Sequence, residues 1–77
     1  MKGLLQYLVT SLVDHPERVS IRETLGQKNV VYMVYLDAED MPRIIGRNGR
    51  VANAVRILLR AVGELNEKAI WVEFSRG

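Results

Sequence analysis

Hydrophobic positions recur at helical spacing near the start of the chain and again in its second half. Leucines and valines three and four residues apart predict an amphipathic helix over residues 2–13, and Pro16 prevents its continuation. A second apolar set predicts a longer helix from Arg50 to about Leu65. Its expected core-facing members are Val51, Val55, Leu58, Leu59, Val62 and Leu65. We expect each helix to bury one face against the rest of the domain.

Three shorter segments show the period of two that is typical of strands. Residues 19–25 alternate apolar and polar side chains, although Glu23 falls on the apolar side. Residues 30–36 are rich in β-branched and aromatic types, and a turn over 26–29 is expected to join these two strands as an antiparallel hairpin. Residues 70–74 alternate again and predict a final strand.

A short helix is predicted over residues 41–45, with Asp40 as its N-cap and Pro42 tolerated in its first turn. The element order is therefore α-β-β-α-α-β. The helical crossover between the second and third strands predicts that they pair in parallel, which makes the second strand central. We expect one two-layer α+β domain over residues 1–77, with a three-stranded mixed sheet and the helices on one face.

The same alternation leaves apolar side chains on the sheet face opposite the helices. Met33 and Tyr35 are expected there from the second strand, and Trp71 from the third. A second apolar surface is a minor stripe on the long helix, formed by Ala54, Ile57 and Ala61. Exposed apolar patches often mark contact surfaces, so both are candidate dimer or partner faces. The alternative is that scattered apolar residues are normal on a protein surface.

Composition excludes several classes of protein. The chain has 77 residues, no Cys and one His, so a disulfide framework is excluded and a zinc site has too few of its usual ligands. No apolar run approaches the roughly 18–20 residues that a membrane span needs. The apolar start lacks a small-residue cleavage site, so we expect a cytoplasmic protein without a membrane anchor.

Positive charge is concentrated in one part of the chain. The formal net charge is +2, but residues 41–63 carry five arginines and no acidic residue, and the remainder has six basic and nine acidic groups. The five arginines are Arg43, Arg47, Arg50, Arg56 and Arg60. Such a cluster favours a localised anion-binding face, and its alternative is a solvated helix surface.

The turn Gly46–Arg47–Asn48–Gly49 is the candidate site. Glycine at both ends lets the backbone approach a ligand, and the free N–H groups at the start of the following helix face the same place. Arg47 and Arg50 add charge beside those donors, while Asn48 adds a hydrogen-bonding group and tolerates unusual φ values. The combination predicts a phosphate clamp without a catalytic residue. A tight helix–helix turn is the alternative explanation.

The motif IIGRNGR, residues 44–50, lies between two helices after a strand and resembles the signature of a KH domain. The element order resembles the type II, bacterial arrangement. The likeness covers nearly the whole chain, which is similar to the KhpA family of small bacterial KH proteins. Pro42 departs from the family pattern, which commonly has Gly at that position.

The resemblance implies a non-catalytic protein that clamps single-stranded RNA, about four nucleotides of it, at the GxxG turn. It implies an RNA chaperone or post-transcriptional regulator in the cytoplasm, with no cofactor, metal or small-molecule substrate. With flanking arginines added from charge and spacing, the expected RNA-binding residues are Arg43, Ile45, Gly46, Arg47, Asn48, Gly49 and Arg50. Self-association, or pairing with a larger KH protein of the Jag (KhpB) type, is also implied.

Three alternatives remain open at this point. An enzyme could use the acidic residues Asp37, Glu39 and Asp40, but helix capping explains them better, and the single His15 lies beside a proline. A protein-interaction module with a vestigial GxxG turn would use the apolar faces. Single-stranded DNA could replace RNA, because the sequence does not show whether a 2′-hydroxyl is read.

Overall fold

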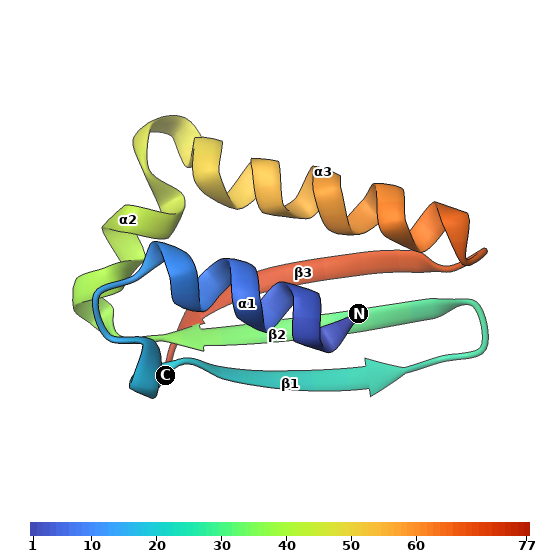
Figure 1. Ribbon diagram of the computed structural model, residues 1–77, viewed down its shortest axis with the longest axis horizontal. Helices are drawn as coiled ribbons and strands as arrows, with labels where there is room; N and C mark the ends of the chain where they lie inside the picture. Colours follow the sequence, from blue (N-terminus) through green and yellow to red (C-terminus); the bar gives the residue numbers. More distant parts are fainter.

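The computed structural model describes residues 1–77, with the side chain of Arg47 excepted (Figure 1). The helices are α1 (Lys2–Leu12), α2 (Met41–Ile45) and α3 (Arg50–Leu65), and the strands are β1 (Ser20–Leu25), β2 (Asn29–Leu36) and β3 (Ala69–Arg76). Short 3-10 turns join them: η1 (Pro16–Arg18), η2 (Ala38–Asp40) and η3 (Arg47–Gly49). The predicted order α-β-β-α-α-β is confirmed.

The sheet has the order β1-β2-β3, so the central position predicted for β2 is also confirmed. β1 pairs with β2 antiparallel and β2 pairs with β3 in parallel. Along β2 the side chains alternate between buried and half-buried, because one face of the sheet is covered by helices. Figure 1 shows α2, η3 and α3 forming the crossover that returns the chain to the edge of the sheet.

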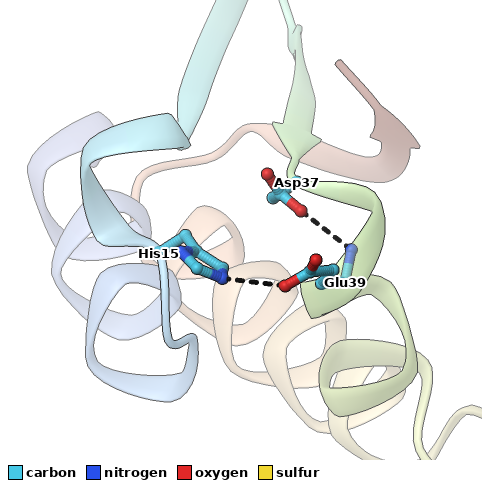
Figure 2. Close-up of side chains that lie close together, drawn as sticks. All are labelled: His15, Asp37 and Glu39. Carbon is cyan, nitrogen blue, oxygen red and sulfur yellow. Dashed lines mark hydrogen bonds and ion pairs between the residues drawn. The ribbon is translucent and has the colours of Figure 1, made fainter.

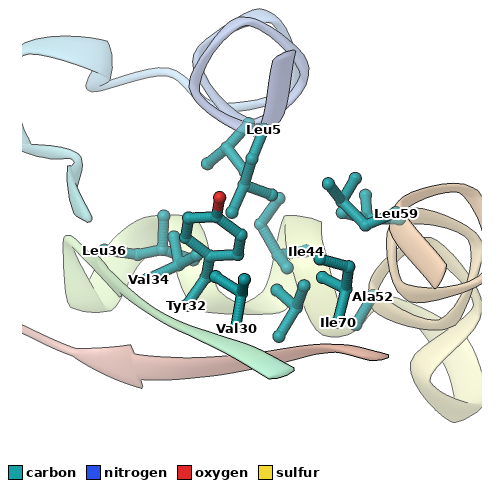
Figure 3. Close-up of a cluster of buried hydrophobic side chains, with 12 residues drawn as sticks. Leu5, Val30, Tyr32, Val34, Leu36, Ile44, Ala52, Leu59 and Ile70 are labelled. Atoms are coloured by element: carbon teal, nitrogen blue, oxygen red, sulfur yellow. The ribbon is translucent and has the colours of Figure 1, made fainter. Parts of the chain in front are cut away.

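One hydrophobic core fills the space between the helices and the sheet (Figure 3). Its buried members are Leu5, Val9, Val30, Tyr32, Val34, Leu36, Ile44, Ala52, Val55, Leu59, Ile70 and Val72. Burying a large aliphatic side chain contributes about 1.5–3 kcal/mol relative to exposure. Ile44 anchors α2 and Leu59 anchors α3 in this core, so the turn between the two helices is held from both sides.

The buried stripe of α3 is narrower than its hydrophobic pattern predicts. Leu58 and Leu65 were expected in the core, but they are 42% and 86% exposed. Its buried residues are Ala52, Val55, Leu59 and Gly63, which follow one another along a single line of the helix. Val51 packs half-buried against the same core. The remaining leucines therefore lie beside the predicted outer stripe and enlarge it.

Asp40 occupies the N-cap position of α2 but does not cap it, contrary to the prediction. Its buried carboxylate accepts hydrogen bonds from the backbone N–H groups of Asp14 and His15, at 3.0 Å each. These two groups follow the end of α1, where the chain has no helical partner for them. Asp40 therefore ties the α1–β1 connection to the start of α2. Asp37 caps the preceding η2 turn, because its carboxylate accepts from the N–H of Glu39 at 2.9 Å.

Glu23, which interrupts the apolar side of β1, has a partner in the core. It pairs across the hairpin with Tyr32, whose hydroxyl donates to Glu23 Oε2 at 2.7 Å. Burial, and then this hydrogen bond, raise the pKa of Tyr32 above its usual value. The carboxylate thus lets a tyrosine occupy the core without an unpaired hydroxyl. Leu25, expected on the apolar side, is exposed at the end of the hairpin.

Candidate nucleic-acid interface

The turn between α2 and α3 projects at one end of the molecule, away from the β1–β2 hairpin (Figure 1). Gly46 ends α2, and η3 leads directly into α3. The N–H of Gly46 donates to the carbonyl of Pro42 at 2.8 Å, which closes the last turn of α2. The short helix and the long helix therefore meet at a tight turn over residues 46–49, called the corner below.

The backbone of this corner requires unusual torsion angles. Gly46 has φ 58° and ψ −158°, a combination that is essentially restricted to glycine. Asn48 and Gly49 both lie in the left-handed region, with φ values of 58° and 70°. The asparagine that the sequence places here is among the few side chains that tolerate this region. A Cβ at Gly46 would come no closer than 3.7 Å to another residue, so glycine is needed for conformation and not for space.

The start of α3 has no side-chain cap. Gly49 is its N-cap and has no side chain with which to cap it, and none of the described side chains accepts from the first N–H groups of the helix. A 16-residue helix also places its positive dipole end here. Backbone donors, positive dipole and the absence of obstructing Cβ atoms make this corner chemically suited to an anion.

The arginines predicted to bind RNA differ in whether they form ion pairs within the protein. Arg50 is exposed and has no ion pair among the described side chains. Arg43 is also exposed, but its Nε lies 2.9 Å from Oδ2 of Asp14. An exposed pair of this kind is weak, so a phosphate can take the place of Asp14. The side chain of Arg47 lies outside the described residues.

The two isoleucines before the turn have separate positions. Ile44 is fully buried in the core, whereas Ile45 is 44% exposed beside Gly46. Only Ile45 can therefore offer an apolar contact to a ligand at the turn. The RNA-binding role of Ile45 stays a prediction.

The guanidinium of Arg56 makes its contacts within the protein. Its Nε donates to the carbonyl of Val72 at 2.9 Å, one terminal nitrogen donates to Asn53 Oδ1 at 3.0 Å, and the guanidinium lies 5.5 Å from the ring centroid of Phe74. These contacts fix the middle of α3 against β3. Arg60, one turn further along α3, is exposed and has no ion pair among the described side chains.

The two predicted apolar faces differ in exposure. On α3, Ala54, Ile57 and Ala61 are all exposed, and Leu58 and Leu65 extend the stripe. On the sheet, Met33 and Tyr35 are only half-buried, because Met33 lies between Arg22 and Glu73 on the neighbouring strands. Trp71 is 53% exposed on the edge strand. The helix stripe is thus the more continuous apolar surface.

A cluster of titratable groups lies under the η2 turn (Figure 2). Possible metal-ligand atoms of His15, Asp37 and Glu39 lie within 4.8 Å of one another. Each already has a protein partner, because Nε2 of His15 lies 3.2 Å from Glu39 Oε2 and Asp37 pairs with the guanidinium of Arg18. The hydrogen bond to Glu39 raises the pKa of His15, and the bond from Arg18 lowers the pKa of Asp37. These contacts join the η1 and η2 turns.

Sequence reasoning missed the long-range roles of the acidic residues. The link from Asp40 to Asp14 and His15 joins positions 25 and 26 residues apart, so no local pattern reveals it. The contacts of Arg56 with β3 have the same character. An acidic residue followed by a short apolar helix is the only signal that the sequence offers, and it points to capping.

The described helices include none with the length and hydropathy of a membrane span. No solved structure matches the chain at a significant level. The family described as KhpA/KhpB, KH domain, matches residues 2–74.

Curated relatives match almost end to end. The RNA-binding protein KhpA of Listeria monocytogenes is 42% identical over 73 residues, which cover 95% of this chain and 96% of the relative. The proteins of the same name from Clostridium perfringens and Chlamydia caviae are each 37% identical over 73 residues, covering 95% of this chain and 97% and 94% of the relatives.

This family is not catalytic, so the enzyme alternative raised by the acidic residues is excluded. The matched range contains every element from α1 to most of β3, including the turn with its three positive φ values. The order of elements, the GxxG corner and the end-to-end similarity agree, and the chain belongs to the KhpA/KhpB family of KH domains.

Proposed function

We propose that this protein binds single-stranded RNA by holding backbone phosphates at the corner between α2 and α3. The observation that carries the proposal is the combination of positive φ at Gly46, Asn48 and Gly49 with the uncapped start of α3. The names of the relatives, which are RNA-binding proteins, support RNA as the ligand. KH domains hold about four nucleotides at such a loop.

Each residue of the corner has a distinct role in the proposal. Gly46 and Gly49 let the phosphates approach the backbone, and the first N–H groups of α3 donate to phosphate oxygens. Arg47 and Arg50 supply positive charge, and Asn48 supplies a hydrogen-bonding side chain. Outside these, Arg43 exchanges Asp14 for a phosphate and Ile45 contacts the first base.

A second part of the proposal is self-association through the outer stripe of α3. Its exposed members recur at helical intervals, and the two alanines allow the helices of two copies to approach closely: Ala54, Ile57, Leu58, Ala61 and Leu65. A dimer presents two clamps and raises avidity for a longer RNA without any new contact. A larger KH protein of the KhpB type is the alternative partner for the same stripe.

With two clamps of low sequence specificity, the protein fits an RNA chaperone or post-transcriptional regulator that acts in the cytoplasm. One KH domain reads few bases, so specificity for a target comes from the pairing of domains.

The test is fluorescence-anisotropy binding of labelled single-stranded RNA at two salt concentrations. The variant Arg47→Asp, Asn48→Asp reverses the charge of the corner, and Asp at position 48 still tolerates left-handed φ. The matched control Arg22→Glu, Gln27→Glu makes the same change in net charge at exposed positions of the hairpin. We expect binding to be lost in the corner variant only. The unmodified protein should show a log–log salt slope of about −0.7 for each phosphate contacted.

Equal binding by the corner variant and the unmodified protein would remove the clamp from the proposal. Salt-insensitive association, with no RNA bound, would favour the protein-interaction module, for which the α3 stripe is the specific support. DNA of the same base sequence distinguishes the remaining alternative. If the DNA binds more tightly than the RNA, single-stranded DNA is the ligand class in place of RNA.

A further inference from the structure

A pocket lies at the other end of α3 from the GxxG corner. It has a volume of about 430 Å³ and is formed by the last turns of α3, the following loop and the start of β3. It is lined by Ala69, Ile70 and the aromatic side chain of Trp71, together with the polar residues Arg60, Glu64, Glu67 and Lys68. Figure 1 shows these segments at the end of the molecule opposite the α2–α3 turn.

Trp71 lies on the edge strand, so no further strand covers it. Strand alternation directs Ile70 and Val72 into the core and leaves Trp71 outside it, 53% exposed. The same indole nevertheless lines the pocket together with Arg60 of α3. An exposed indole beside an arginine without an ion pair among the described side chains is the pairing that binds single-stranded nucleic acid, by stacking on the base and by charge on its phosphate.

A polar stripe on α3 connects the pocket to the corner. Arg50, Asn53, Arg56 and Arg60 follow at three- and four-residue intervals, so they share one side of the helix. The contacts of Arg56 with Val72 and Phe74 place that side along β3. Arg50 and Arg60 are about 15 Å apart along the helix axis, at 1.5 Å per residue. That distance is beyond the nucleotides next to the turn but within reach of the same strand.

We propose that this pocket is a second subsite for the same RNA, in which Trp71 stacks on a base and Arg60 contacts the adjoining phosphate. The proposal rests on the RNA binding proposed above and lengthens its footprint along α3. Glu64 and Glu67 also line the pocket, and their carboxylates can only accept hydrogen bonds when ionised. They therefore favour bases with an exocyclic amino group, which are adenine, cytosine and guanine, over uracil, whose one base donor is its N3–H.

The test uses the fluorescence of Trp71, which is the single tryptophan of the chain. The probes are a ten-nucleotide RNA of alternating cytidine and adenosine and its four-nucleotide counterpart. We expect the decamer to quench the indole at concentrations that saturate binding, and the tetramer to bind the corner with much less quenching. Removal of stacking on one base corresponds to a loss of affinity of roughly 5- to 150-fold. Trp71→Ala should therefore weaken binding of the labelled decamer within that range, and Trp71→Phe should restore most of it.

Tyr7→Ala is the matched control, because it removes another exposed aromatic side chain, 70% exposed, from α1. We expect it to leave the affinity for the decamer unchanged. Circular dichroism verifies that each variant folds, and sedimentation measures its oligomeric state.

Decamer binding without quenching and without a loss in Trp71→Ala would overturn the subsite and leave the corner clamp standing. No binding of either RNA by the unmodified protein would overturn both. A change of oligomeric state in Trp71→Ala, with RNA affinity unaltered, would assign the pocket to a protein contact and overturn the subsite as well.

Discussion

Gly63 lies inside α3, where replacing glycine by alanine normally stabilises a protein. Alanine is the better helix former by about 0.8–1.0 kcal/mol. At this position, however, an added Cβ would lie 2.7 Å from the backbone carbonyl oxygen of Lys68 and against the side chain of Ile70. The carbonyl of Gly63 also accepts from the N–H groups of Asn66 and Lys68, at 2.9 and 2.8 Å, so the loop that holds the obstructing oxygen is fixed to the helix.

The magnitude follows from the two opposing effects. Overpacking a well-filled site costs typically about 1–3 kcal/mol, and a backbone atom that cannot move puts Gly63→Ala in the upper part of that range. After the gain in helix propensity is subtracted, we expect a net loss of about 1–2 kcal/mol in the free energy of unfolding. For a domain of this size, that lowers Tm by roughly 5–15 °C.

Gly3→Ala is the matched control, because nothing lies within 4 Å of a Cβ at Gly3 in α1. We expect it to raise the free energy of unfolding by about 0.5 kcal/mol. The assay is thermal unfolding followed by circular dichroism at one fixed protomer concentration, since association would shift Tm. A Tm for Gly63→Ala at or above that of the unmodified protein would refute the close approach of α3 to β3.

Four further changes have defined expected outcomes. Asp40→Ala removes the acceptor of two N–H groups and should lower the free energy of unfolding by about 2–5 kcal/mol in urea denaturation, and an unchanged midpoint would contradict the link. His15→Gln should change the pH dependence of Tm. Because the pKa of His15 is raised, its stabilising contribution is present below the unfolded pKa of 6.5 and is lost as pH rises through the folded pKa. The unmodified protein should therefore lose more Tm than the variant over that rise in pH. Gly46→Ala should cost about 1–3 kcal/mol of stability or abolish RNA binding through a distorted corner, and a variant that retains both would show that the torsion angles are not required. Ile57→Lys should shift the protein toward the monomer in sedimentation without unfolding it, because the replaced side chain is 64% exposed, and an unaltered association state would remove the α3 stripe from the proposed interface.

The elements were predictable because their periods are distinct. Alternation in β2 and three- and four-residue spacing in α3 depend on which side of each element faces the core, and that information is local. The position of the buried stripe around α3 is not local information, as Leu65 shows. It lies four residues after Ala61 and seven after Leu58, on the side of the helix that the fold leaves exposed.

The candidate site likewise has one part that the sequence predicts and another that depends on the fold. The corner could be predicted from Gly46 and Gly49, because backbone torsion limits which residues can stand there. The ion pairing of the surrounding charges could not be predicted, because the pairing of Arg43 with Asp14 joins parts of the chain that only the fold brings together. The pocket beside Trp71 was missed for the same reason, because its walls come from two elements joined by a loop.

The parallel pairing of β2 with β3 has a consequence for the newly made chain. Each pair joins residues 40 positions apart, as Asn29 with Ala69, and β3 is made last. Until β3 emerges from the ribosome, one edge of β2 has no strand to pair with, and Ile70 and Val72 are missing from the core. Contacts so distant in sequence slow folding and leave an open strand edge that can pair with other chains. The domain therefore completes its fold only after β3 has been synthesised and has paired with β2.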